Sequence, residues 1–191
     1  IYYKMIKIAL MGEIASGKTF VGKCFRYPIF NADDEVKKIY KNNKQCFKKL
    51  NNKFPKNIIN FPINKIQLRN ILNKKNIKIL SKIVHPYVRK VLKKFLKKNK
   101  SKKYVILDIP LLVENKLHNK SDILIYVKST KKIINKRLKK RKNFNKKLLT
   151  ILKSQQLDLN KKIKLSHYII NNSSDKKNTL KQVIKIKKEI K

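Results

Sequence analysis

Short apolar runs recur along this chain, and polar stretches long enough for helices separate them. An apolar run of about four to eight residues, rich in β-branched side chains, is typical of a strand buried on both faces of a parallel sheet. Strands that alternate with helical stretches in this way predict βαβ units. We therefore expect an α/β fold with a parallel five-stranded sheet flanked by helices, and the predicted strands are Met5–Met11, Pro28–Asn31, Tyr104–Ile109, Ile123–Val127 and Tyr168–Ile170.

A different pattern separates the second predicted strand from the third. Residues 51–100 are polar, contain three prolines and carry apolar residues at helical spacing, such as Val88, Leu92 and Phe95. This pattern predicts a helical insertion within a single domain that spans residues 1–191. Further helices are expected over residues 18–25, over residues 33–50 and in the last segment, where Ser174 or Asp175 stands at a capping position.

The charge of the chain is unusual. Of 191 residues, 52 are Lys or Arg and 10 are Asp or Glu, so the formal net charge is +42. Such a charge suits a polyanionic partner. However, half the chain consists of Lys, Asn and Ile, whose codons are AT-rich, and the lysines are spread over its whole length. A nucleotide bias of the genome accounts for this composition, and a basic nucleic-acid-binding protein is kept as the less favoured alternative.

The sequence also argues against several locations and sites. No apolar run approaches the ~20 residues that a membrane helix needs, and no signal-peptide pattern is visible. We therefore expect a cytoplasmic protein without a membrane partner, and a monomer. Two cysteines do not make a disulfide framework or a metal knuckle, and three widely spaced histidines do not favour a structural zinc site.

Glycine is rare in this chain, so its positions are informative. Two of the three glycines frame GEIASGKT at residues 12–19, directly after the first apolar run and before a helical stretch. This is the G-x-x-x-x-G-K-[ST] pattern of a phosphate-binding loop (P-loop), whose backbone N–H groups surround phosphates at a helix N-terminus. The pattern predicts that Lys18 reaches the β- and γ-phosphates of ATP and that Thr19 is a Mg²⁺ ligand. The residues expected to bind ATP here are Gly12, Ala15, Ser16, Gly17, Lys18, Thr19 and Phe20.

Two carboxylates follow predicted strands, at the edge where open α/β sheets bind ligands. Asp33 lies just past the second strand, where it can accept the proton of a hydroxyl that attacks the γ-phosphate. The alternative is that Asp33 only caps the following helix. Asp108 ends the third strand, where it can support Mg²⁺ or, as the alternative, cap the next turn.

Two of the five arginines, Arg137 and Arg141, are four residues apart and so share one helix face. Their place beyond the fourth strand predicts a lid over residues 137–150 that holds ATP and stabilises the developing charge. The alternative is a solvated surface.

Further strings follow the P-loop in a recognisable order. They are Asn31-Ala32-Asp33, Leu68-Arg69, His85-Pro86, PLLVEN at residues 110–115, and Ile169-x-Asn171. In order and spacing the chain resembles the dephospho-coenzyme A kinases from Met5 to Lys191. The resemblance implies a P-loop kinase fold with a helical coenzyme-A-binding insertion and a lid. It also implies transfer of the ATP γ-phosphate to the ribose 3′-hydroxyl of dephospho-coenzyme A, the last step of coenzyme A synthesis.

The resemblance assigns roles to single residues. It places Asp33 at the acceptor hydroxyl, and with Lys18 and Arg141 this gives the expected catalytic set. The residues expected to bind the substrate are Asp33, Arg69, His85, Leu111 and Glu114, although His85 has the alternative of packing or capping. ATP is expected to contact Arg137 and, near the adenine, Asn171.

A few positions depart from the family pattern. Glu13 and Ala15 each replace a glycine of the usual loop, and Asn31 stands where an Asp is usual. Ser166 and Ser173 replace an Asp and a Gly around the last strand. Glu13 and Ala15 leave an inactive relative open as an alternative. Independently of these departures, another P-loop kinase that acts on a nucleoside monophosphate or small metabolite also stays open.

Overall fold

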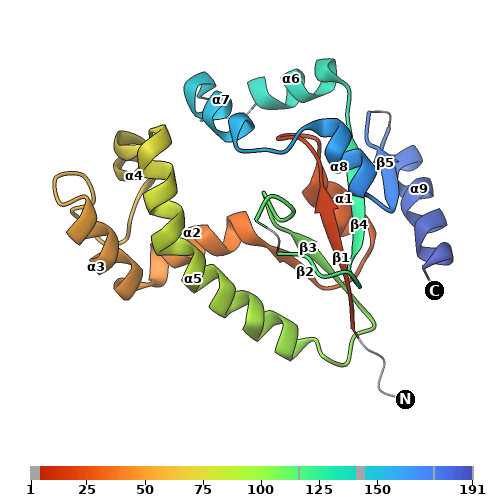
Figure 1. Cartoon of the computed structure of the whole chain (residues 1–191), viewed down its shortest axis with the longest axis horizontal. Coiled ribbons are helices and arrows are strands. Elements are labelled where there is room, and N and C mark those ends of the chain that lie inside the picture. Colours follow the sequence, from red (N-terminus) through yellow and green to blue (C-terminus); the bar gives the residue numbers. More distant parts are fainter. Residues whose placement is uncertain (1–4, 116, 141–144, 174, 191) are drawn as a thin grey trace. The chain divides into compact units, whose positions relative to one another are not determined.

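The computed structural model describes residues 5–115, 117–140, 145–173 and 175–190. The chain divides into two compact units (Figure 1). The core unit consists of Ile1–Asn31 and Asn99–Lys191, and the helical unit consists of Ala32–Lys98. The helical unit begins at Ala32 and not near residue 51, because the two helices that follow the second strand pack within it.

The core unit contains the five-stranded sheet, and every pair of neighbouring strands in it is parallel. The strand order is β2-β3-β1-β4-β5, so β1 lies at the centre between β3 and β4. This confirms the predicted fold class. The strands are β1 (Ile6–Met11), β2 (Ile29–Asn31), β3 (Tyr104–Asp108), β4 (Ile123–Lys128) and β5 (Tyr168–Asn171).

The position of β1 determines where a ligand can bind. The chain passes from β1 to β2 and β3 on one side, and then crosses to β4 on the other side. Ligands of open α/β sheets bind beyond the carboxyl ends of the strands at such a switch point. The segment that follows β1 at this point is the predicted P-loop.

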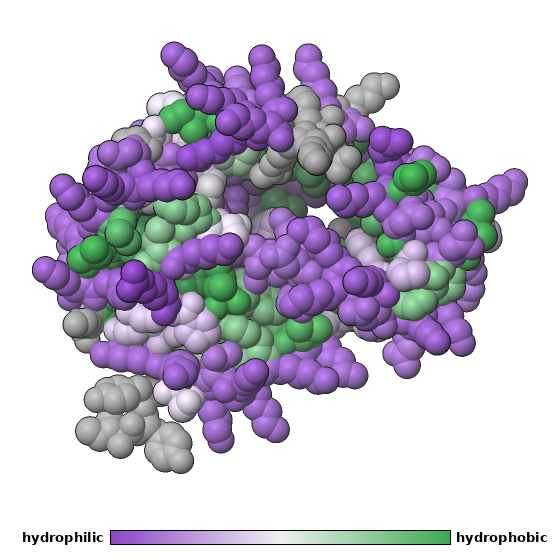
Figure 2. Space-filling view, turned by 180° about the vertical axis from the view of Figure 1, so that it is seen from behind, coloured by the Kyte–Doolittle hydropathy of each residue, from purple (hydrophilic) through white to green (hydrophobic). Residues whose placement is uncertain are grey.

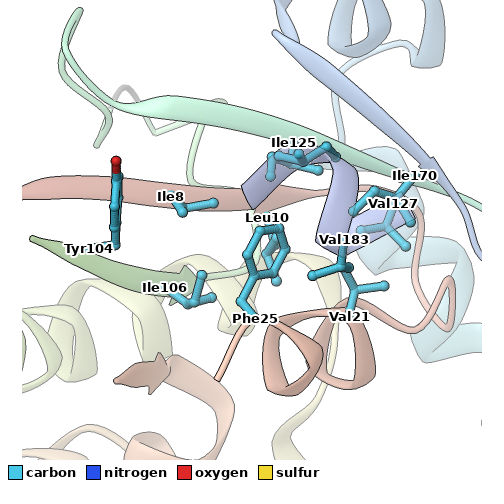
Figure 3. Packing of buried hydrophobic residues seen from close by; sticks show 11 residues of the cluster. Ile8, Leu10, Val21, Phe25, Tyr104, Ile106, Ile125, Val127, Ile170 and Val183 are labelled. Carbon is cyan, nitrogen blue, oxygen red and sulfur yellow. The ribbon is translucent and has the colours of Figure 1, made fainter. Parts of the chain in front are cut away.

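Helices α1 (Lys18–Cys24) and α9 (Lys176–Glu189) contact each other and contribute to one apolar core with the sheet. The core forms because alternate residues of each buried strand point to the same face. Figure 3 shows Val21, Phe25 and Val183 packed against the strand residues Ile8, Leu10, Ile106, Ile125, Val127 and Ile170. The remaining helices of the core unit are α6 (Lys131–Lys139), α7 (Lys146–Ser154) and α8 (Leu159–Leu165), of which α8 packs on β4.

The last helix begins as predicted. Asp175 is the N-cap of α9, and its side chain accepts a hydrogen bond from the backbone N–H of Asn178 at 2.6 Å. The face that α9 buries carries Thr179, Val183 and Ile186. Thr179 is fully buried, and its hydroxyl lies within hydrogen-bond distance of Asn172 Oδ1 and the Asp175 carbonyl.

The helical unit contains α2 (Ala32–Asn42), α3 (Lys44–Lys53), α4 (Lys65–Ile71) and α5 (Lys74–Lys98). The single helix expected over residues 33–50 is wrong in one respect, since it is broken at Asn43. The Asn43 side chain accepts a hydrogen bond from the Cys46 N–H at 2.8 Å, which makes Asn43 the N-cap of α3. Both α2 and α3 pack on α5, around buried residues such as Leu50 and Ile58.

The surface reflects the composition. Hydrophilic residues dominate the face shown in Figure 2, and hydrophobic residues form small separate patches between them. Over the described part of the chain, no helix combines the length and the apolar character required to cross a bilayer.

Candidate active site

The P-loop between β1 and α1 adopts an unusual backbone conformation. The angle φ is +143° at Gly12, +66° at Ala15 and +96° at Gly17. A Cβ atom at Gly12 would lie 2.5 Å from the carbonyl oxygen of Val127, and one at Gly17 would lie 2.1 Å from Nδ2 of Asn172. Both positions therefore favour glycine for two reasons: the positive φ angle is strained for other residues, and a Cβ atom would clash with its neighbours.

Polar groups of the loop converge on its interior. The Lys18 ammonium donates to the carbonyl oxygens of Gly12 at 3.1 Å and Glu13 at 3.0 Å, so a positive charge lies against the loop. Ser16 is fully buried, and its Oγ is among the few buried side-chain atoms of the described residues that find no hydrogen-bond partner. A buried hydroxyl of this kind is costly unless a ligand satisfies it, which fits a phosphate-binding loop.

Three side chains from different segments meet where α1 begins. The Thr19 hydroxyl donates to the Asp108 carboxylate at 2.6 Å, and the Asn31 amide donates to the same carboxylate oxygen at 2.8 Å. Asp108 is buried. A hydroxyl and a carboxylate are the hard oxygen ligands that Mg²⁺ prefers, so these residues fit that ion. The described residues hold no group of three or more His, Cys, Asp or Glu side chains suited to a metal.

The two loop positions that usually carry glycine have different surroundings. Ala15 is buried, and its methyl group packs with Ile134 and Leu138 of α6. Glu13 lies near Tyr126 of β4: burial raises the pKa of Tyr126, and the negative charge of Glu13 raises it further. The left-handed backbone of Ala15 costs roughly 1–2 kcal/mol, which burial of its methyl by about 0.8 kcal/mol partly offsets.

These opposing terms lead to a stability prediction for Ala15. Ala15→Gly removes the strain but also loses the methyl contacts and gains unfolded-state entropy, so we expect less than about 1 kcal/mol change in the free energy of unfolding. Ala15→Val adds a β-branched side chain at φ +66° and should destabilise the protein by about 2 kcal/mol or more. Urea unfolding of the two variants measures both. A marked gain in stability from the glycine variant would show that the methyl contacts contribute nothing.

Arg137 is held against the outside of the P-loop. Its NH1 donates to the Ser16 carbonyl at 2.7 Å and to Ser129 Oγ at 3.1 Å, and its NH2 donates to the Asn172 carbonyl at 3.0 Å. Burial lowers the pKa of Arg137, but a guanidinium stays charged at neutral pH. The solvated-surface alternative is therefore wrong for Arg137. Arg141 lies outside the described residues, so its role and the lid stay predictions.

The sequence prediction missed Asn172, which the structure places at the P-loop. Its Nδ2 donates to the Ser16 carbonyl at 2.8 Å, and only 3% of the residue is exposed. The neighbouring Asn171 is exposed, and its side chain accepts a hydrogen bond from the Ser173 N–H, so its predicted contact with adenine stays untested. The sequence did offer one signal for Asn172. Residues i and i+2 of a strand lie on the same face, so Asn172 is expected to share the buried face of Ile170.

The string PLLVEN follows β3, and its first five residues, 110–114, line a pocket with Gly12 and Lys18. Leu111 has φ +57°, a strained conformation of the kind that clusters at functional sites. The Glu114 carboxylate accepts from Lys162 of α8 at 2.6 Å and from the Leu157 N–H at 3.1 Å, and both charged side chains are largely buried. The structure thus gives Glu114 a bracing role that the sequence did not reveal, while its contact with substrate stays a prediction.

The other predicted site residues belong to the helical unit. Asp33 is exposed. It is the second residue of α2, so it does not occupy the N-cap position, which precedes the first residue of the helix. Arg69 is exposed on α4. The pKa of His85 on α5 is lowered, first by partial desolvation of the imidazole and then by the charge of Arg89 one turn along. The ring is therefore neutral at neutral pH and can accept a hydrogen bond.

Comparison with known proteins agrees with this geometry. The family model for dephospho-CoA kinase matches residues 6–178. The chain belongs to the dephospho-CoA kinase family. It is 34% identical to the dephospho-CoA kinase of Bartonella henselae over 190 residues, which is 96% of this chain and 97% of that one. It is 32% identical to the dephospho-CoA kinase of Bartonella quintana, over 94% of this chain and 95% of that one.

Solved structures share the fold of this kinase. A protein from Thermus thermophilus superposes with a TM-score of 0.80 at 23% identity, covering 98% of this chain and 99% of that one. The dephospho-CoA kinase from Campylobacter jejuni superposes with a TM-score of 0.65 at 23% identity, covering 96% of each chain. As a member of this family the chain is a transferase of coenzyme A biosynthesis, and ATP is its phosphoryl donor.

Proposed function

We propose that this kinase binds ATP at residues 12–19 and transfers the γ-phosphate to the ribose 3′-hydroxyl of dephospho-CoA. The observation that carries the proposal is the P-loop itself, with its two glycines at positive φ, its buried Ser16 hydroxyl and Lys18 against its carbonyl oxygens. Backbone N–H groups in such a loop bind phosphate oxygens without reorganisation. Family membership supports the choice of acceptor.

The protein's contribution to phosphoryl transfer is positioning and charge stabilisation. Lys18 exchanges its hydrogen bonds with the Gly12 and Glu13 carbonyls for the β- and γ-phosphates of ATP. Asp33 accepts the proton of the acceptor hydroxyl as the bond to phosphorus forms. Arg141 adds positive charge where negative charge develops.

Mg²⁺ would be held by Thr19 and Asp108, whose oxygens are hard ligands of the type it prefers. When bound, the ion neutralises phosphate charge during the transfer. The Asn31 amide holds the Asp108 carboxylate in place. An aspartate at position 31 would instead place a second negative charge beside that carboxylate, so fewer negative charges would face the ion in this chain.

Residues that the family pattern assigns to the acceptor are Arg69, His85, Leu111 and Glu114. Arg69 supplies positive charge for a phosphate group of dephospho-CoA, and neutral His85 supplies a hydrogen-bonding group. Leu111 and Glu114 belong to the pocket that also includes Lys18, and their roles toward substrate follow the family pattern. We further infer a cytoplasmic, monomeric enzyme.

The decisive test measures ADP release by the purified chain with ATP, Mg²⁺ and dephospho-CoA. We expect ADP only when the acceptor is present, and coenzyme A as the second product. Adenosine monophosphate and shikimate serve as alternative acceptors, because other P-loop kinases use small acceptors of this kind. Equal ADP release with and without dephospho-CoA, or faster turnover of another acceptor, would overturn the proposal. An inactive relative would release no ADP with any acceptor.

A further inference from the structure

The carbonyl oxygen of Ser16 is the most heavily bonded acceptor of the P-loop. It accepts from Arg137 NH1 at 2.7 Å and from Asn172 Nδ2 at 2.8 Å. Ser129 Oγ also lies 3.0 Å from it and 3.0 Å from the Asn172 carbonyl oxygen, so the single hydroxyl proton of Ser129 is shared between these two acceptors. The three donors come from three segments: the end of β4, helix α6 and the end of β5. We call these three side chains the carbonyl clamp.

The clamp is itself firmly held. Asn172 donates its backbone N–H to the Lys128 carbonyl at 2.8 Å. Its Oδ1 lies 3.2 Å from the Thr179 hydroxyl, which can donate to it or to the Asp175 carbonyl, also at 3.2 Å. Asn172 and Thr179 are both buried, so the contact between them is shielded from water. This network orients the amide group of Asn172 so that Nδ2, and not Oδ1, faces Ser16.

Peptide geometry gives the clamp a consequence for phosphate binding. A trans peptide is planar, so its N–H points opposite to its C=O. Because the Ser16 carbonyl faces the clamp, the N–H of Gly17 in the same peptide unit points away from the clamp. Hydrogen bonds to a carbonyl also polarise the attached N–H, which strengthens it as a donor.

The clamp also explains why position 17 has no side chain. A Cβ atom there would lie 2.1 Å from Asn172 Nδ2 and 3.1 Å from Arg137 NH1. The space that a side chain of residue 17 would need is thus filled by two members of the clamp. The same contacts prevent the peptide from turning over, which would direct its carbonyl at the phosphates.

We propose that Ser129, Arg137 and Asn172 are positioning residues that fix the Ser16–Gly17 peptide with its N–H directed at the β-phosphate of the nucleotide. This inference rests on the proposed ATP site at residues 12–19. It concerns the donor half of the reaction alone, so binding of dephospho-CoA is unaffected.

The test compares Kd values for ADP and AMP, measured by calorimetry on the full chain. AMP lacks the β-phosphate and serves as the internal reference. In Asn172→Ala the Kd for ADP should rise on the order of tenfold, as expected for a weakened hydrogen bond to a charged group, while the Kd for AMP changes less than about twofold. KM for ATP should rise likewise, with KM for dephospho-CoA unchanged. The matched control is Asn178→Ala, an exposed position on α9.

Two further variants keep the test valid if Asn172→Ala folds poorly. Ser129→Ala removes one donor, and Thr179→Val removes the hydroxyl that orients Asn172 while keeping its shape. Both should weaken ADP binding more than AMP binding. Equal losses for ADP and AMP, or a lower melting temperature with unchanged ADP binding, would show that the clamp only stabilises the fold. If the unaltered protein did not bind ADP, the proposed function itself would fail, and the clamp's role with it.

Discussion

Lys18→Ala should lower the turnover number on the order of 10²–10³-fold, the loss typical of one preorganised donor to transition-state charge. The Lys18 ammonium donates to the Gly12 and Glu13 carbonyl oxygens, which places its positive charge at the P-loop, where the phosphates are proposed to bind. Steady-state ADP release at saturating ATP and dephospho-CoA measures the effect.

The control for Lys18→Ala must account for the high positive charge of the chain. Lys23→Ala makes the same change of charge on the same helix, at an exposed position. We expect its turnover to stay within about twofold of the unaltered protein, because exposed charges a helical turn away are screened by salt. If the two variants lost activity equally, the effect would be one of net charge and not of phosphate contact.

Asp33→Asn should remove most turnover while leaving ATP binding intact. A positioned general base contributes about 10²–10⁴-fold to a proton transfer, and an amide cannot accept the proton. Asp33 lies inside the first turn of α2 and not at the N-cap position before it, so its general-base role stays a prediction that this variant tests. The measurements are turnover at saturating substrates and the Kd for ATP.

Asp34→Asn is the matched control for Asp33→Asn. Asp34 is the next residue of the same turn, and its carboxylate pairs with Lys37 at 2.7 Å on an exposed face. Both variants remove one negative charge from the N-terminus of α2, so both should lower stability by similar small amounts. Only the change at Asp33 should affect turnover. Comparable activity in the two variants would reduce Asp33 to a favourable charge at a helix N-terminus.

The sequence predicted the sheet well because its central strands, such as β3 and β4, are largely buried on both faces. Continuous apolar runs such as Ile123–Val127 differ clearly from the polar, lysine-rich helices, and the observed strands agree with the predicted ones to within one or two residues. The helical unit was harder. A cap such as Asn43 interrupts a helix through one side-chain hydrogen bond, and Asn is so common in this chain that it carries little signal.

In the candidate site, too, the local features could be predicted from the sequence and the long-range contacts could not. The P-loop is contiguous, so its eight residues and their spacing are visible in the sequence. Asp108 and Thr19 are 89 residues apart and meet only through the pairing of parallel strands, although each stands at a position that the motif and the strand end single out. Arg137 was noticed because arginine is rare, but its contacts with backbone carbonyls could not be anticipated.

The sequence by itself determined the α/β fold class and the P-loop motif, because strand burial, helix periodicity and motif spacing are encoded by neighbouring residues. Its resemblance to the dephospho-CoA kinases rests on the order of further short strings, and the family model matches residues 6–178. Only the tertiary structure decided which side chains hold the loop from outside. Asn172 lies 156 residues from Ser16 in sequence, and their contact arises because β1, β4 and β5 are adjacent in the sheet. Every residue has a backbone carbonyl, so a hydrogen bond to that group cannot be predicted from the identity of the acceptor residue. This part of the site is therefore known only from the positions of the strands.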